Sequence, residues 1–113
     1  MLGKIFQEFR ETDSALETYR KIKGAPEIKA KAFNNMGIVY LSLNEPEKAL
    51  VEFKNSLRTY RGIPDTHYNL GKLILDLKGD KESARAHLNK ALSLVQNPIL
   101  KVQIKKLLQQ IAS

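Results

Sequence analysis

The sequence predicts an all-α fold in which helical hairpins are stacked along the chain. Three glycines, Gly3, Gly37 and Gly71, follow one another at intervals of 34 residues, and a fixed interval of this length is typical of helical repeats. Prolines and capping residues divide the segments between them at regular places. Because one hairpin cannot bury its own apolar face, we expect the units to stack on one another.

The first half of each unit has the same pattern around its glycine. The glycine follows a leucine or methionine and precedes a large apolar or aromatic side chain by three residues, as in Leu2-Gly3 with Phe6, Met36-Gly37 with Tyr40, and Leu70-Gly71 with Ile74. A glycine inside a helix costs about 1 kcal/mol relative to alanine. We therefore expect these glycines where two helices must approach closely.

The second half of each unit repeats as well, with an additional residue in the third turn near Gly79. The equivalent residues are, in chain order, Ala15 with Tyr19, Ala49 with Phe53, and Ala84 with Leu88. Small side chains permit a tight helix crossing, so Gly37 is expected to face Ala49. Large side chains are then expected to fill the space between hairpins, namely Phe33, Tyr40 and Phe53.

Helix boundaries follow from capping residues and early prolines. The expected helix starts are marked, in chain order, by Thr12 or Asp13, Asn44 with Pro46, Pro64, Asp80, and Asn97 with Pro98. The predicted helices span about residues 2 to 10, 13 to 24, 27 to 43, 46 to 60, 64 to 78, 81 to 95 and 98 to 111.

The last predicted helix lacks the glycine and has a single apolar stripe, formed by Leu100, Ile104, Leu107, Leu108 and Ile111. This spacing places all five side chains on one helix face. Its other face is polar, so we expect this helix to cover the exposed end of the third hairpin, as a terminal cap does in a solenoid.

Length and composition restrict the possible classes of protein. A chain of 113 residues with 42% apolar content forms one small domain. It has no cysteine, which excludes disulfides and thiol chemistry, and no apolar run typical of a membrane span or signal peptide. We expect a cytoplasmic location, with a periplasmic one open if the chain is a fragment.

The segment Phe33-x2-Met36-Gly37-x2-Tyr40, followed by Ala49-x3-Phe53, resembles the tetratricopeptide repeat family, whose pattern is aromatic-x2-Leu-Gly-x2-Tyr and then Ala-x3-Phe. The third copy differs, with His67 at the first aromatic position. The resemblance implies a right-handed solenoid in a single domain of residues 1–113. We expect a truncated repeat at about 1–26, repeats at 27–62 and 63–96, and a capping helix at 97–112.

The same resemblance implies a concave groove, lined by the first helix of each hairpin, that binds an extended peptide or a partner's helix. Carried over position by position, the groove residues are Lys31, Asn34, Asn35, Ile38, Leu41, Asp65, Tyr68, Asn69, Lys72 and Leu75. An asparagine offers both a donor and an acceptor, so Asn35 and Asn69 are expected to pair with a ligand's peptide groups, although they could instead bridge neighbouring helices.

Nothing in the sequence predicts catalysis, a cofactor or a metal site. His67 is expected to be a buried or half-buried structural residue, and His87, next to Leu88, is expected to project into solvent. Glu52 is grouped with the other carboxylates of turns and first helical turns, whose negative charge is expected to interact favourably with the helix dipole. The protein is therefore predicted to be a scaffold or adaptor without enzymatic activity.

Two alternatives stay open beside this interaction module. The uncapped N-terminal end could mediate self-association or join a longer solenoid. The C-terminal end is basic, since residues 83–113 hold 5 Lys and Arg and no Asp or Glu within a chain of net charge +7. It could bind an acidic partner or nucleic acid through Arg85, Lys90, Lys101, Lys105 and Lys106, although no aromatic stacking surface accompanies the charge.

Overall fold

The computed structural model describes residues 12–112, and every regular element in this range is a helix. A first helix covers residues 12–20. It is followed by α2 (Pro26–Ser42), α3 (Pro46–Thr59), α4 (Pro64–Lys78), α5 (Lys81–Leu94) and α6 (Pro98–Ala112). The predicted all-α fold is confirmed. Gly3 and the predicted helix at 2 to 10 lie outside the described residues.

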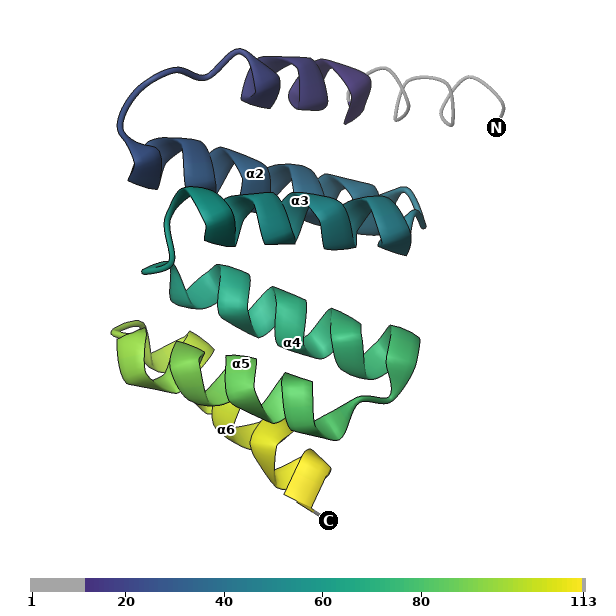
Figure 1. Cartoon of the computed structure of the whole chain (residues 1–113), viewed down its shortest axis with the longest axis vertical. Helices are drawn as coiled ribbons and strands as arrows, with labels where there is room; N and C mark the ends of the chain where they lie inside the picture. The colour runs from purple at the N-terminus through teal and green to yellow at the C-terminus, as the bar shows by residue number, and fades with distance from the viewer. Residues whose placement is uncertain (1–11, 113) are drawn as a thin grey trace.

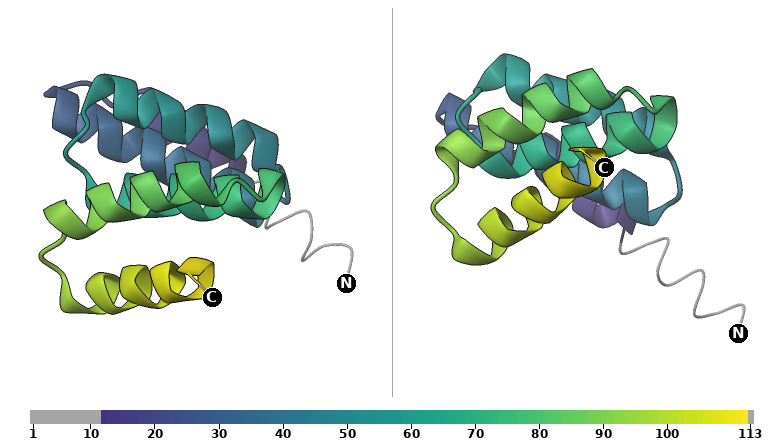
Figure 2. Two further views of the ribbon diagram at one scale, coloured as in Figure 1. Left: turned by 60° about the horizontal axis from the view of Figure 1, so that its bottom comes forward. Right: turned by 90° about the horizontal axis from the view of Figure 1, so that it is seen from below.

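The helices are stacked in chain order, from helix 12–20 at one end to α6 at the other (Figure 1). α2 and α3 form one antiparallel hairpin, and α4 and α5 form the next. α6 crosses the outer end of the second hairpin at an angle and is joined to α5 by an extended loop (Figure 2). This is the stacked arrangement that the 34-residue interval predicts.

The helix starts follow from the local sequence. Prolines occupy the beginning of α2, α3, α4 and α6, where the missing amide hydrogen costs no helical bond. Asp80 caps α5, because its carboxylate accepts a hydrogen bond of 3.1 Å from the amide of Ser83. Gly79 ends α4 in the left-handed conformation, with a φ of 63°.

The predicted end of the helix at 13 to 24 is wrong. Thr12 and Asp13 are helical, close to the predicted start, but the helix ends at Arg20 instead of continuing to Gly24. Gly24 has a φ of 144°, which is incompatible with a helix and belongs to the connection into α2.

The glycines stand where the paired helices touch, but the partner of Gly37 differs from the prediction. A Cβ added to Gly37 would meet the ring of Phe53, at 2.6 Å from Cδ1 and 2.8 Å from Cζ, rather than Ala49. In the next hairpin a Cβ on Gly71 would lie 3.1 Å from the carbonyl oxygen of Ala84. The ring of Phe53 is turned toward α2, and Gly37 leaves the space that this ring occupies.

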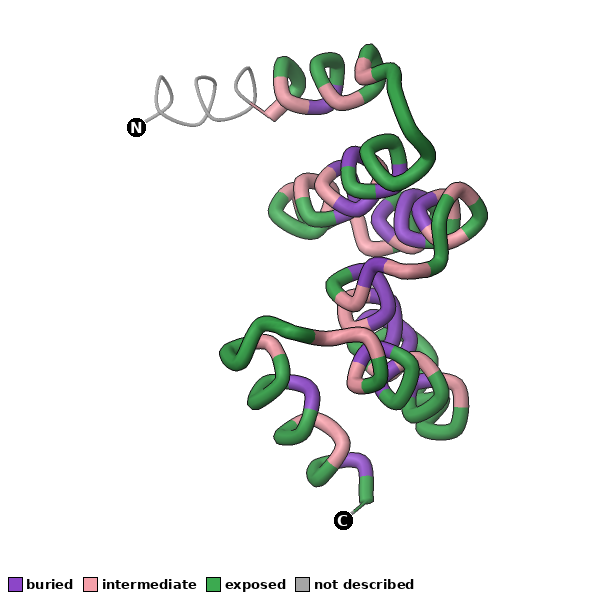
Figure 3. Tube along the Cα trace, turned by 90° about the vertical axis from the view of Figure 1, so that its left-hand side faces the viewer, coloured by how far each residue is buried: buried purple, intermediate pink, exposed green. Residues whose placement is uncertain are grey.

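Two apolar clusters make up most of the core, and Figure 3 shows the buried positions on the inner sides of the helices. One cluster joins α3 to α4 and contains Ala49, Phe53, Leu70, Leu73 and Ile74. The other joins α5 to α6 and contains Ala84, Leu88, Ala91, Ile104 and Ile111. Leu100, Leu107 and Leu108 pack against the second cluster, so the whole apolar stripe of α6 faces the last hairpin as predicted.

Buried polar groups fix how the helices are set against one another. The hydroxyl of Ser56 donates to the carbonyl oxygen of Ala30 at 2.7 Å. The hydroxyl of Thr66 lies 3.0 Å from the Ser56 hydroxyl, so α2, α3 and α4 meet at Ser56. Glu52 was expected in a first helical turn, but it lies in the middle of α3, is buried, and its Oε2 has no hydrogen-bond partner among the described residues. It lies on the same face of α3 as Ala49 and Ser56, one turn from each, which explains its burial.

Candidate functional site

The predicted groove residues lie on α2 and α4 and differ widely in exposure. Lys31, Ile38, Leu41, Asp65 and Lys72 are exposed. Asn35, Tyr68, Asn69 and Leu75 are half-buried, and Asn34 is buried.

Two of these residues bind each other. The side-chain amide of Asn69 donates a hydrogen bond of 3.1 Å to Oδ1 of Asn34, which joins α4 to α2. Asn69 therefore bridges neighbouring helices, which is the structural role that its sequence position also allowed. Asn35 takes no part in this bond and is half-buried.

The apolar side chains of the predicted groove divide into two pairs. Ile38 and Leu41 on α2 are 46% and 40% exposed, which is high for large apolar side chains. Tyr68 and Leu75 on α4 instead pack against the cluster that α5 forms with α6. The C-terminal helix thus covers part of the strip that the sequence predicts as a binding surface.

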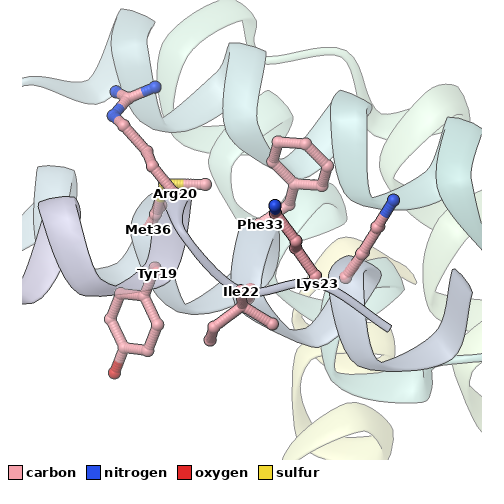
Figure 4. A pocket seen from close by; sticks show the side chains of 8 residues that line it. Tyr19, Arg20, Ile22, Lys23, Phe33 and Met36 are labelled. Carbon is pink, nitrogen blue, oxygen red and sulfur yellow. The ribbon is translucent and has the colours of Figure 1, made fainter. Parts of the chain in front are cut away.

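A pocket of about 460 Å³ lies between helix 12–20, with the residues that follow it, and α2 (Figure 4). Phe33 and Met36 of α2 form part of its wall, so Phe33 does not completely fill the space between hairpins. Arg20 and Lys23 also line the pocket, and Arg20 donates a hydrogen bond of 2.8 Å to the hydroxyl of Tyr40. This bond ties helix 12–20 to α2.

A second pocket, also of about 460 Å³, lies where α3 ends and α4 and α5 come together. We call it the histidine pocket; its lining residues are Leu57, Arg58, Arg61, His67, Ala86, His87 and Lys90. His67 is equivalent to Phe33, 34 residues earlier, which lines the first pocket. The histidine brings two ring nitrogens to the position that the phenyl ring has in the preceding unit.

The two histidines contact each other. Nε2 of His67 is 2.8 Å from the carbonyl oxygen of Arg61, and since a carbonyl only accepts, Nε2 carries the proton. Nδ1 of neutral His67 is then an acceptor, and Nδ1 of His87 lies 3.4 Å away as the donor. The expectation that His87 projects into solvent is therefore wrong. His87 lies at i+3 from Ala84 and i−4 from Ala91, on the edge of the buried face of α5.

The surroundings disfavour positive charge on both histidines. Burial lowers the pKa of His67, the hydrogen bond to Arg61 raises it, and the charges of Lys90 and Arg61 lower it further. Burial also lowers the pKa of His87, and so does the charge of His67 when that residue is protonated. Near neutral pH the pair is therefore uncharged, with cationic neighbours.

The folded protein should lose stability as the pH falls below about 6.5, the ordinary pKa of histidine in an unfolded chain. In that range the unfolded chain binds protons that the folded state excludes, because the pKa of both His67 and His87 is lowered by folding. Each such proton changes the free energy of unfolding by at most about 1.4 kcal/mol per pH unit. Urea denaturation between pH 7.5 and 5.5 measures the slope. His87→Gln should reduce it, and a flat profile in the unsubstituted protein would contradict the pKa directions.

Comparison with known families bears on the second hairpin. Residues 64–97, which contain α4 and α5, match the family model described as the tetratricopeptide repeat. These residues are therefore similar to a tetratricopeptide repeat. No curated protein matches the chain. The resemblance deduced from the sequence is thus confirmed over this stretch, while the boundaries of the other repeats stay predictions.

Tetratricopeptide repeats generally serve protein–protein interaction and have no catalytic activity of their own. Within residues 12–112, no group of three or more His, Cys, Asp or Glu side chains is placed to hold a metal ion. None of the helices in that range is both long and apolar enough to cross a membrane.

Sequence reasoning missed the histidine pocket. A local signal was available for one member, since His67 replaces the aromatic residue that the preceding tetratricopeptide pattern has as Phe33. The other members come from α3, the connection that follows it and α5, and their convergence with His67 depends on how α3, α4 and α5 are packed.

Proposed function

We propose that the protein is an interaction module that binds a segment of another protein along the exposed face of α2, at Ile38 and Leu41. The tetratricopeptide repeat at 64–97 supports an interaction role. The exposure of these two large apolar side chains on neighbouring turns of one helix is the observation that carries the location.

The binding mechanism requires no conformational step. A rigid helix face lowers the entropic cost of ordering a flexible partner, because only the partner must be immobilised. Ile38 and Leu41 supply apolar contact area, and Asn35, one turn before Ile38, supplies a donor and an acceptor for peptide groups. Lys72 at the surface favours a partner with some acidic residues.

The proposal predicts that Ile38→Asp with Leu41→Asp weakens peptide binding by about tenfold or more, since it places charge where apolar anchors dock. Peptides selected from a random phage-displayed library on the unsubstituted protein are the probes, and fluorescence polarisation measures their affinity. The matched control is Val51→Asp with Ile99→Asp, which adds the same charge at exposed apolar sites of α3 and α6.

Two results would contradict the assignment. One is a library that yields no peptide binding more tightly than millimolar. The other is a selected peptide whose affinity falls in the control but stays within about twofold in the Ile38 and Leu41 variant, because binding would then involve another face.

A further inference from the structure

The histidine pocket combines several positive groups with no negative one. Arg58 at the end of α3, Arg61 in the following connection, and Lys90 on α5 all line it. No carboxylate is among its described lining residues. The ion pairs found within residues 12–112 join Lys31 to Glu27 and Lys48 to Glu45, so none of the three pocket cations is paired with a carboxylate of that range.

Two hydrogen-bonded imidazole rings line this pocket. His67 is 6% exposed and is held by its hydrogen bond to the Arg61 carbonyl oxygen, and His87 is held against it at 3.4 Å. Because one Nδ1 donates to the other, a single proton taken up by the pair places a positive charge beside Arg61 and Lys90. A charge there is unfavourable unless an anion enters the pocket.

We propose that the histidine pocket binds a phosphate monoester. A phosphate group carries about −1.5 to −2 charges at pH 7 and three acceptor oxygens, which matches two guanidinium groups and one ammonium. Leu57 and Ala86 give the pocket an apolar portion, and its volume of about 460 Å³ exceeds what a bare phosphate fills. The ester's carbon body occupies that remainder.

This site shares no residue with the proposed peptide-binding face on α2. A two-histidine metal site is a poorer explanation, because no third His, Cys, Asp or Glu within the described residues completes the ligand set and three cations surround it. A carboxylate has fewer acceptor oxygens and less charge than a phosphate, so it is expected to bind more weakly.

Phenyl phosphate is the first probe, with inorganic phosphate and benzoate beside it, and the ring signals of His67 and His87 in NMR spectra report binding. We expect saturable shifts of both histidines with phenyl phosphate, weaker shifts with inorganic phosphate, and the weakest with benzoate. The anion should also raise the pKa of the histidine pair, which an NMR pH titration with and without probe measures.

Arg58→Gln with Arg61→Gln should weaken phenyl phosphate binding by about tenfold or more, because two charge-assisted contacts are lost. Lys54→Gln with Arg85→Gln is the matched control; it removes the same charge from exposed positions on α3 and α5 outside the pocket lining. All four side chains are exposed, so both variants are expected to keep their helical circular dichroism.

A phosphotyrosine peptide distinguishes two sources of the monoester. Tighter binding of the peptide than of phenyl phosphate would indicate a phosphorylated protein side chain, and equal binding would indicate a small phosphorylated molecule. The proposal is overturned if the histidine signals do not shift at millimolar phenyl phosphate. It is equally overturned if the control variant loses as much affinity as the pocket variant, since net charge alone would then explain binding.

Discussion

Phe53→Ala should lower the free energy of unfolding by about 3–5 kcal/mol, which is much of the stability that a domain of this size has. Phe53 is completely buried, belongs to the cluster that joins α3 to α4, and covers Gly37 of α2. Urea denaturation followed by circular dichroism measures the loss. Val51→Ala on the same helix is the control, because Val51 is 55% exposed and should change stability by less than about 0.5 kcal/mol.

Gly37→Ala tests the reason for this effect. Helix propensity alone predicts that the free energy of unfolding rises by about 1 kcal/mol, whereas overpacking against the Phe53 ring predicts that it falls by about 1–3 kcal/mol. In the Phe53→Ala background the ring is absent, so the same substitution should become neutral or stabilising. A stabilising Gly37→Ala in the unsubstituted protein would show that the ring can move aside at little cost, which the contact distances argue against.

Ile104→Asp should lower the free energy of unfolding by more than about 3 kcal/mol, because the packed α6 would bury a charge with no partner. We therefore expect α6 to detach from the second hairpin. Ile104 is completely buried among Ala84, Leu88 and Ala91. Val102→Asp on the same helix is the control, since Val102 is 52% exposed.

Hydrogen exchange gives the local readout for this substitution. The amides of α6 should lose protection in Ile104→Asp and keep it in Val102→Asp, and Tyr68 and Leu75 should become more accessible when α6 leaves. If α6 stays protected in Ile104→Asp, the helix is held by something other than its apolar stripe.

The sequence by itself determined the kind of fold. Local patterns carry this information, because sequence spacing on a helix fixes which side chains share a face. The patterns are Gly37 and Gly71 with their equivalent apolar neighbours, and the apolar stripe of α6. Prolines determined most helix starts for the same reason, since a proline acts on its own residue and its immediate neighbours. The order of the hairpins and the covering of the last one by α6 follow from these local rules.

Only the tertiary structure decided which side chains meet between elements. The pairing of Asn34 with Asn69 spans 35 residues, and the contact of His67 with His87 spans 20. Such contacts depend on how far each helix is rotated about its own axis and shifted along its neighbour. Packing of all the side chains at once sets these quantities, whereas a repeat pattern in the sequence leaves them open.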